Sequence, residues 1–319
     1  MKSRIEFAHL PTKIEALPRL SAALQGPRLF VKRDDQTGLA FGGNKTRKLE
    51  YLLADARNQE ADLLITAGAV QSNHCRQTIA AASRFGFDCI LVLFGDPPEP
   101  PDGNHLLHYL LGAEVVFTQR EHVENKLRDV FQNAFSEGRK PYLIPYGGSN
   151  PTGAMGYVNA MLELAQQDHT PDWIIFPSSS GGTQAGMLVG ARISGYTGKI
   201  LGISVDEPAE VLKMTVSKLA TETAAAIDKD WYFSVDNVLV NDEYTGQGYA
   251  VMGEPEIEAI RLFAQKEALI LDPVYTGRAG AGLIDLIRVG FFDTSDTVLF
   301  WHTGGGPALF ASRYQGRLV

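Results

Sequence analysis

Lys45 stands at an unusual position in the segment FGGNKTRKLE. Two glycines lead into a stretch of helical period, so this lysine falls in the first turn of a predicted helix, where unpaired N–H groups already carry partial positive charge. At about 100° per residue, Lys45 shares a face with Leu49 and Leu52, whereas Arg47 lies on the far side. We therefore expect Lys45 to point toward the core, and Lys48, at the edge of the apolar stripe, to reach solvent.

The chemistry that an inward lysine offers is that of an amine nucleophile. Burial and the helix dipole both disfavour the ammonium form, so the pKa of Lys45 should be lowered. Only the neutral amine attacks a carbonyl to form a Schiff base. The alternative is a lysine that extends past the apolar stripe into water.

Two polar turns offer anion sites that could accompany this amine. SSSGGTQAG follows the apolar run WIIFP and opens a helix, so its N–H groups and hydroxyls could hold one phosphate. QSNH follows another apolar run, and the free N–H groups of its helix suit a carboxylate. In both turns, plain helix capping explains the polar residues equally well. The residues concerned are Ser180, Gly181, Gly182 and Thr183 in the first turn and Gln71, Ser72 and Asn73 in the second.

The amine and the two anion sites together indicate one kind of ligand. An aldehyde that carries a phosphate would engage Lys45 and the first turn, and pyridoxal 5'-phosphate (PLP) is such an aldehyde. The chain has neither a P-loop nor the G-x-G-x-x-G of a dinucleotide fold at these turns. It also lacks the G-x-S-x-G elbow of serine hydrolases. Its seven histidines show no metal-ligand spacing, so we expect no metal.

The bulk properties exclude several classes of partner. The chain has 319 residues and a net charge of −8, without a basic patch that would favour nucleic acid. Its two cysteines, Cys75 and Cys89, are too few for a disulfide framework. The first residues contain no signal peptide, and the apolar runs are too short to span a membrane. We expect a cytoplasmic protein that acts on a small molecule.

Short apolar runs alternate with longer stretches of helical period, which predicts an α/β fold. Such alternation is typical of mostly parallel sheets covered by helices on both faces. The polar turns follow strands, and parallel sheets bind ligands beyond the carboxyl ends of their strands. The expected strands are 29–33, 63–69, 89–95, 114–118, 142–145, 173–177, 200–205 and 297–302, and the expected helices are 44–57, 74–85, 122–137, 153–168, 182–193, 208–226, 254–267 and 277–289.

Six motifs resemble, in order and spacing, the D-cysteine desulfhydrase and 1-aminocyclopropane-1-carboxylate (ACC) deaminase family. They are VKRDDQTGLAFGGNKTRKLE, TAGAVQSNHCRQT, IPYGGSNPTGAMGY, SSSGGTQAG, LDPVYTGRAGAGLIDL and HTGGGPALF, and the match covers nearly the whole chain. The resemblance implies a PLP enzyme and a homodimer with the tryptophan synthase β-like fold (fold type II), which has two open, mostly parallel, twisted sheets. We expect a large domain of residues 1–50 and 159–319 and a small domain of residues 51–158.

The resemblance also implies roles for the residues of the two polar turns. Lys45 would form the Schiff base, and Asn73 would bond the ring hydroxyl of the cofactor. Ser72 and the adjacent N–H groups would take the substrate carboxylate, with Gln71 also on the substrate side. Residues 180–183 would hold the phosphate.

Two tyrosines match phenols that line the substrate side in this family. They are Tyr249 and Tyr275, and both could equally be packed tyrosines with solvated hydroxyls. Thr303 of HTGGGP is expected beside the cofactor. Lys45 is the expected base for the α-proton, and Ser72 or a tyrosine on the opposite face is the alternative.

Two positions separate this chain from the ACC deaminases that it resembles. ACC deaminases have Glu after the residue that matches Tyr275, and this carboxylate keeps the pyridine nitrogen protonated. This chain has Thr276, which should contact the cofactor and leave it a weaker electron sink, sufficient for β-elimination. Thr276 could also cap the following helix. Gly306 stands where ACC deaminases tend to carry a bulky apolar residue.

The sequence therefore predicts a PLP-dependent lyase that converts D-cysteine, or a similar β-substituted alanine, to pyruvate, ammonia and hydrogen sulfide. ACC deaminase and L-cysteate sulfo-lyase stay open as alternatives. A non-catalytic amino-acid-binding α/β protein, which belongs to another functional class, also stays open as an alternative. The residues do not fix which enantiomer reacts.

Overall fold

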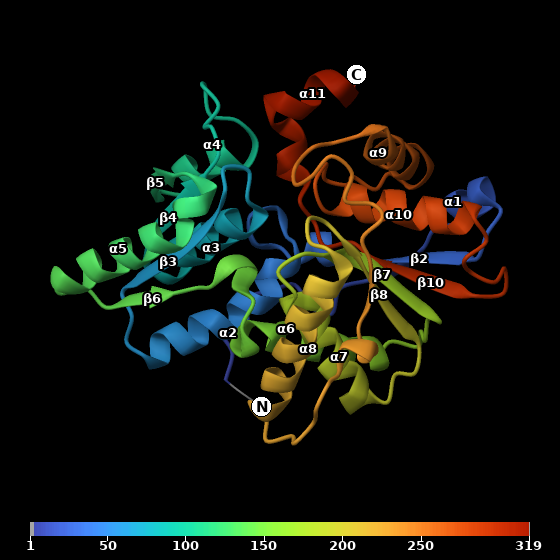
Figure 1. Cartoon of the computed structure of the whole chain (residues 1–319), viewed down its shortest axis with the longest axis horizontal. Helices are drawn as coiled ribbons and strands as arrows, with labels where there is room; N and C mark the ends of the chain where they lie inside the picture. Colours follow the sequence, from blue (N-terminus) through green and yellow to red (C-terminus); the bar gives the residue numbers. More distant parts are fainter. Residues whose placement is uncertain (1–2, 319) are drawn as a thin grey trace.

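Two β-sheets with helices on both faces make up the protein (Figure 1), whose computed structural model describes residues 3–318. This confirms the expected α/β fold with two mostly parallel sheets. In the larger sheet the first strand is antiparallel to its neighbour and the other pairs are parallel. Its strands, in spatial order, are β1 (Ile14–Ala16), β2 (Arg28–Lys32), β10 (Thr297–Trp301), β7 (Trp173–Ser178), β8 (Lys199–Ser204) and β9 (Leu239–Asn241).

Strand β7 shows why the larger sheet needs helices on both sides. Successive side chains of a strand point to opposite faces, so Ile174 and Phe176 are buried on one face and Ile175 on the other. A strand covered on both faces has a continuous apolar sequence. The helices of the first face are α6 (Pro151–Ala165) and α7 (Gly182–Ser194), with α8 (Ala209–Ala225) packed on α7, and those of the second are α1 (Pro18–Leu24), α9 (Glu254–Glu267) and α10 (Thr276–Arg288).

The smaller sheet, at the left of Figure 1, is built in the same way. Its strands, in spatial order, are β5 (Glu114–Thr118), β4 (Asp88–Phe94), β3 (Leu63–Ala69) and β6 (Pro141–Leu143), all parallel. Leu64 and Leu91 pack on one face against α2 (Asn44–Asn58) and α3 (Asn73–Phe85). Leu63 and Ile65 pack on the other face against α5 (Val123–Ser136).

Every expected strand and helix is present, and the elements that the sequence did not predict are short. Strands β1 and β9 have three residues each and lie at the edges of the larger sheet. Such segments are too short for a hydrophobic period to emerge. The unpredicted α-helices are α1, α4 (Gly103–Leu110) and α11 (Ser312–Leu318).

Helix α2 is buried on several sides, which its apolar stripe did not indicate. Arg47 is 1% exposed and pairs with Asp34 at 2.8 Å and Glu163 at 2.9 Å. Lys48, expected to reach solvent, is also 1% exposed, so that expectation was wrong. The reason is that α2 packs against α6, a helix on the larger sheet, as well as against α3, so its polar face meets protein too.

The strands of the smaller sheet all fall within residues 51–158, and those of the larger sheet fall outside that range. Both expected domain boundaries fall inside helices, α2 and α6, which pack against each other. The division at these residues therefore stays a prediction. Within residues 3–318, no helix is long and apolar enough to cross a membrane, and no cluster of His, Cys, Asp or Glu is placed to hold a metal ion.

Candidate active site

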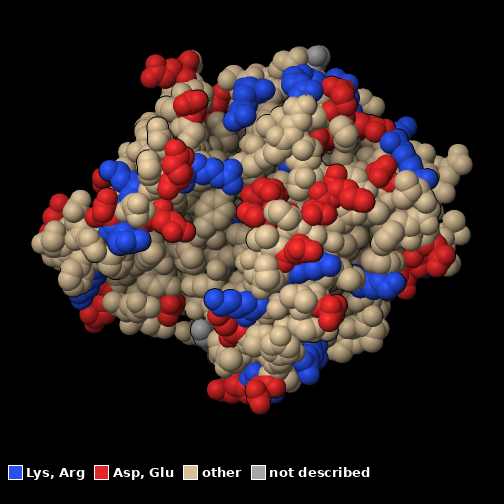
Figure 2. Space-filling view, viewed as in Figure 1, with Lys and Arg blue, Asp and Glu red and all other residues tan. Residues whose placement is uncertain are grey.

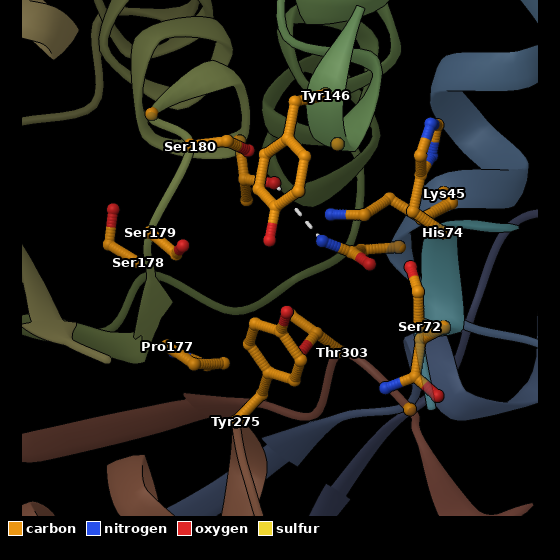
Figure 3. A pocket seen from close by; sticks show the side chains of 16 residues that line it. Lys45, Ser72, His74, Tyr146, Pro177, Ser178, Ser179, Ser180, Tyr275 and Thr303 are labelled. Atoms are coloured by element: carbon orange, nitrogen blue, oxygen red, sulfur yellow. Dashed lines mark hydrogen bonds between the residues drawn. The ribbon is translucent and has the colours of Figure 1, made fainter. Parts of the chain in front are cut away.

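A cavity at the carboxyl ends of the strands collects the polar turns (Figure 3). Its walls come from the first turn of α2, the β3–α3 turn, the short helix η4 (Tyr146–Gly148), the β7–α7 turn, the start of α10 and the loop after β10. Ligands of parallel sheets bind at this edge. The lining residues are Asn44, Lys45, Ser72, Asn73, His74, Tyr146, Gly147, Pro177, Ser178, Ser179, Ser180, Gly181, Thr183, Tyr275, Thr303 and Gly304.

Lys45 extends from the first turn of α2 into this cavity (Figure 3). The helix follows Gly43, whose φ of 128° is a conformation that favours glycine, and the Asn44 N–H donates to the Thr303 carbonyl at 3.0 Å. No hydrogen bond holds the Lys45 amine within the described chain. Burial lowers the pKa of Lys45 to about 8, so about a tenth of the amine is neutral at pH 7, far more than for a solvated lysine.

Lys48 lies one turn further along α2, behind the cavity wall. Its Nζ donates to the Gly147 carbonyl at 3.1 Å and to the Ser149 hydroxyl at 3.3 Å. Burial, and then the charge of Lys45, lower the pKa of Lys48 well below its usual value. The buried polar loop at Gly147 therefore holds the side chain that was expected in solvent.

The β7–α7 turn presents an anion cradle. Gly181 has a φ of 80°, and α7 begins at Gly182 without a side-chain cap, so the N–H groups of its first turn face the cavity end. The N–H of Gly182 is the exception, because it donates to Ser149 Oγ at 3.2 Å. Ser149 Oγ also lies 2.7 Å from Ser180 Oγ. On the α2 side, the Asn44 amide donates to the Thr183 hydroxyl at 3.2 Å.

The β3–α3 turn forms the opposite wall, where Ser72 caps α3 by accepting from the Cys75 N–H at 3.1 Å. The capping interpretation of Ser72 is thus correct, and its side chain also lines the cavity. Gln71 does not line this cavity, but it lines an adjoining cleft. Its amide nitrogen donates to Asp102 Oδ1 at 2.8 Å, and its amide oxygen accepts from the Asn104 N–H at 2.8 Å. The polar atoms of this side chain bond the start of α4, and a substrate role for Gln71 stays a prediction.

Two tyrosines meet on the substrate side. The hydroxyls of Tyr275 and Tyr249 are 2.8 Å apart. Of the two, only Tyr275 lines the cavity, while Tyr249 lines the adjoining cleft, between the ends of β3, β4 and β5 and the start of α11. Burial raises the pKa of both phenols well above the ordinary value, so both are neutral. Tyr146 from η4 joins them at the wall, and burial raises its pKa to about 12.

Thr276 lies behind the cavity wall and does not line it. It is fully buried, and its hydroxyl donates to Asp272 Oδ1 at 2.7 Å and accepts from the Asp272 N–H at 2.7 Å. Asp272 itself accepts from the backbone N–H groups of Val274, Tyr275 and Thr276. The carboxylate of Asp272, not the hydroxyl of Thr276, thus caps the start of α10.

Among the lining residues to which the sequence analysis assigns no role are Asn44, Tyr146 and His74. Asn44 and Tyr146 lie beside the glycines of the motifs FGGNKTRKLE and IPYGGSNPTGAMGY. His74 lies in the first turn of α3. It is buried and bonds Thr66 through Nε2 at 2.9 Å, but its Nδ1 has no partner within residues 3–318. No residue type or spacing in the sequence indicated that free nitrogen.

The comparisons with known proteins agree with this arrangement. Residues 5–304 match the model of a family described as pyridoxal-phosphate dependent enzyme. The chain belongs to the pyridoxal-phosphate-dependent enzymes. Its cofactor is therefore pyridoxal 5'-phosphate.

Solved structures superpose over most of the chain. A crystal structure of an ACC deaminase homologue is 37% identical, with a TM-score of 0.91, and the match covers 99% of this chain and 95% of that one. A fungal L-serine ammonia-lyase from Rhizomucor miehei shares the fold at 15% identity, with a TM-score of 0.71 and coverages of 98% and 100%. Threonine deaminase isoform 2 from Solanum lycopersicum does so at 15% identity, with a TM-score of 0.68 and coverages of 96% and 82%.

The residues of this PLP enzyme fit the cofactor. Lys45 is an unbonded amine whose pKa of about 8 leaves part of it neutral for a carbonyl. The uncapped first turn of α7, with the glycines at 181 and 182, gives a phosphate its N–H donors without side-chain bulk. Behind this turn, the buried Lys48 amine donates to Ser149 Oγ, which also accepts from the Gly182 N–H.

Proposed function

We propose that this PLP enzyme is a β-eliminating lyase that acts on D-cysteine or a similar β-substituted alanine. The supporting observation is that none of the sixteen residues lining the cavity is Asp or Glu. Asp272, behind the wall, is engaged by three backbone N–H groups and the Thr276 hydroxyl. A cavity without an accessible carboxylate offers no counter-ion to a protonated ring nitrogen of the cofactor, and this favours substrates with a good leaving group.

When bound, the cofactor accepts the electron pair released at the substrate's α-carbon. The Cα–H electrons then form a Cα–Cβ double bond, and the Cβ–S electrons leave with sulfur as thiolate, which takes a proton to become hydrogen sulfide. Water converts the remaining enamine to pyruvate and ammonia. We assign Lys45 to hold the cofactor, the turn at 180–183 to bind its phosphate, and Asn73 to bond its ring oxygen.

We assign proton transfer at the substrate's α-carbon to Lys45. Its pKa of about 8 places the amine close to the pH at which it can both accept and return a proton. Ser72 lines the opposite wall, and its N–H-rich turn would hold the substrate carboxylate. Tyr275, neutral and bonded to Tyr249, is the alternative donor and acceptor on that side.

ACC deamination is the second candidate, because the structure with 37% identity is an ACC deaminase homologue. ACC has no β-leaving group, so opening its ring needs a stronger electron sink than a cavity without a carboxylate favours. L-Cysteate is the third candidate. Arg120 lines the cleft outside the cavity with its guanidinium 5.5 Å from the Tyr249 ring centre, where it could attract a sulfonate.

The experiment is a substrate panel of D-cysteine, L-cysteine, L-cysteate and ACC, assayed for pyruvate, 2-oxobutyrate, sulfide and sulfite. We expect D-cysteine to give pyruvate and sulfide in equal amounts, with a kcat/KM at least about tenfold above that of every other compound. Release of 2-oxobutyrate from ACC at a comparable rate would overturn the proposal, as would preferential release of sulfite from L-cysteate.

A further inference from the structure

The side-chain amide of Asn73 has a fixed polarity. Its oxygen accepts two hydrogen bonds, from Arg76 Nη1 at 3.1 Å and from Asn104 Nδ2 at 2.8 Å. Its nitrogen has no partner within residues 3–318, and it would lie 2.8 Å from a Cβ placed on Gly305. Asn73 lines the cavity, so the end of the amide left for a ligand is a donor.

This polarity follows from Arg76, because a guanidinium can only donate. Arg76 Nη1 donates to Asn104 Oδ1 at 2.9 Å, so Oδ1 of Asn104 faces Arg76 and its Nδ2 faces away. That Nδ2 donates to the Asn73 oxygen and to the Gln71 carbonyl at 2.9 Å. The Asn104 N–H in turn donates to Gln71 Oε1. The orientation of each of these side-chain amides is therefore fixed by a guanidinium or a backbone group, whose roles as donor or acceptor cannot be exchanged.

Arg76 is itself an unusual buried cation. It is fully buried, yet no carboxylate lies within 4.0 Å of it among the described residues, whereas Arg47 and Arg278 have Asp34 and Glu256 at 2.8 Å. Its Nη2 donates to the Gly42 carbonyl at 2.9 Å, and its Nε has no partner. Burial lowers the pKa of Arg76 to about 10, so it is still charged at neutral pH. Asp272 attracts Arg76 from beyond contact distance. A buried charge that no counter-ion contacts is costly unless a ligand supplies one.

We propose that Arg76 and Asn104 are positioning residues that present the Asn73 amide nitrogen to the cofactor's ring oxygen, and that the charge of Arg76, acting through Asn73, stabilises this oxygen as an anion. The inference rests on the proposed placement of Asn73 beside the ring oxygen. It explains why the fold keeps an unpaired guanidinium behind the cavity wall. It also assigns a function to α4, whose Asn104 supplies the second hydrogen bond.

The test is a spectrophotometric pH titration of the bound cofactor in the holoenzyme, without substrate, from about pH 6 to 10. Removing a donor and a positive charge near the ring oxygen favours the protonated form of the bound cofactor, so the titration midpoint should rise. We expect a rise of about one pH unit or more in Arg76→Met and Asn104→Asp, and a smaller rise in Arg76→Lys, which keeps the charge without the fork. Asn104→Asp is informative because a carboxylate cannot donate to the Asn73 oxygen.

Two further variants calibrate the result. Asn73→Leu should raise the midpoint as much as Arg76→Met does. Arg84→Met removes an exposed cation from the same helix, where Arg84 lies on the Phe85 ring, and should leave the midpoint unchanged. Thermal unfolding of each cofactor-free variant identifies those that fold. If Arg76→Met does not fold, Arg76→Lys and Asn104→Asp carry the test.

Midpoints of all Arg76 and Asn104 variants within about 0.2 units of the wild-type value would overturn the inference. If Asn73→Leu shifts the midpoint while the other variants do not, Asn73 does lie beside the ring oxygen, but Arg76 and Asn104 are not positioning residues. If Asn73→Leu does not shift the midpoint either, both claims are wrong. Because no substrate is used, failure of the D-cysteine assay would overturn the proposed reaction and leave this inference intact.

Discussion

Tyr249 and Tyr275 share a 2.8 Å hydrogen bond between their phenol oxygens, and this bond lies where the inner cavity meets the adjoining cleft. Tyr275 comes from the start of α10, and Tyr249 from the loop before α9. Both phenols are neutral, because burial raises the pKa of each well above its ordinary value. The pair therefore acts as a donor and an acceptor, never as a charge.

Removing one hydroxyl of this pair tests its contribution to turnover. We expect Tyr275→Phe to lower kcat/KM for D-cysteine by about 10²-fold, as loss of one proton-transferring or orienting group does. Tyr249→Phe should cost about tenfold, since it leaves the Tyr275 hydroxyl in place without its partner. Steady-state kinetics with D-cysteine measure both. Equal losses in the two variants would mean that the pair acts as one unit.

Lys45, and not Lys48, should carry the cofactor. Borohydride should bleach the visible band of the holoenzyme and fix the cofactor to the peptide that contains residue 45, which mass spectrometry identifies. Lys45→Ala should lose turnover by at least about 10³-fold, because covalent and proton-transfer roles vanish together. Lys48→Met should keep the covalent label and lower the affinity for the cofactor instead. Label on Lys48 would contradict the assignment.

The rate at which the cofactor-free protein takes up the cofactor should rise with pH. Lys45 attacks only as the neutral amine, and burial lowers its pKa to about 8, so the rate should increase through a midpoint near that pH. Stopped-flow absorbance measures it. Lys218→Met, which changes a 78% exposed lysine, is the matched control and should not move the midpoint. A midpoint near the ordinary lysine pKa of 10.5 would show that Lys45 is solvated.

Substitution of Thr276 by Glu should damage the enzyme more than it changes its substrate. The side chain is fully buried and hydrogen-bonded to Asp272, so a second carboxylate would face the first without water. We expect a loss of about 3 kcal/mol in the free energy of unfolding and a large loss of D-cysteine activity, with little gain toward ACC. Thr276→Ser keeps the hydroxyl and serves as the control. Denaturant unfolding and kcat/KM for both substrates are the measurements, and robust ACC turnover by Thr276→Glu would contradict this prediction.

The ion pairs of Arg47 anchor the helix that carries Lys45. Burial by itself would raise the pKa of Asp34, but the adjacent Arg47 holds it below its usual range. Asp34→Ala leaves Arg47 with one partner fewer in a buried site, so we expect a loss of about 3 to 5 kcal/mol of stability. Glu258→Ala breaks the exposed pair with Arg288 and should cost less than about 1 kcal/mol. Similar losses in the two variants, measured by denaturant unfolding, would contradict the anchoring role.

The sequence by itself determined the alternation of strands and helices, the polar turns at the strand ends and the inward direction of Lys45. These features are local. Strands β3, β4 and β7 have continuous apolar runs because helices cover both faces of each sheet, and α2 has an apolar stripe because one of its faces meets the core. The predicted inward amine and the two polar turns indicated an aldehyde that carries a phosphate, and the resemblance to a family then implied a role for each residue.

Only the tertiary structure decided what the polar side chains do. Lys48 is buried because Gly147 and Ser149, about a hundred positions later in the chain, fold over it, and Gln71 turns away because α4 supplies Asp102 and Asn104. A hydrophobic period indicates that one face of a helix is buried, but it does not indicate which polar groups of distant segments will bond the other residues of that helix. Hydrogen bonds between distant segments depend on how the two sheets are placed, and no local signal encodes that placement.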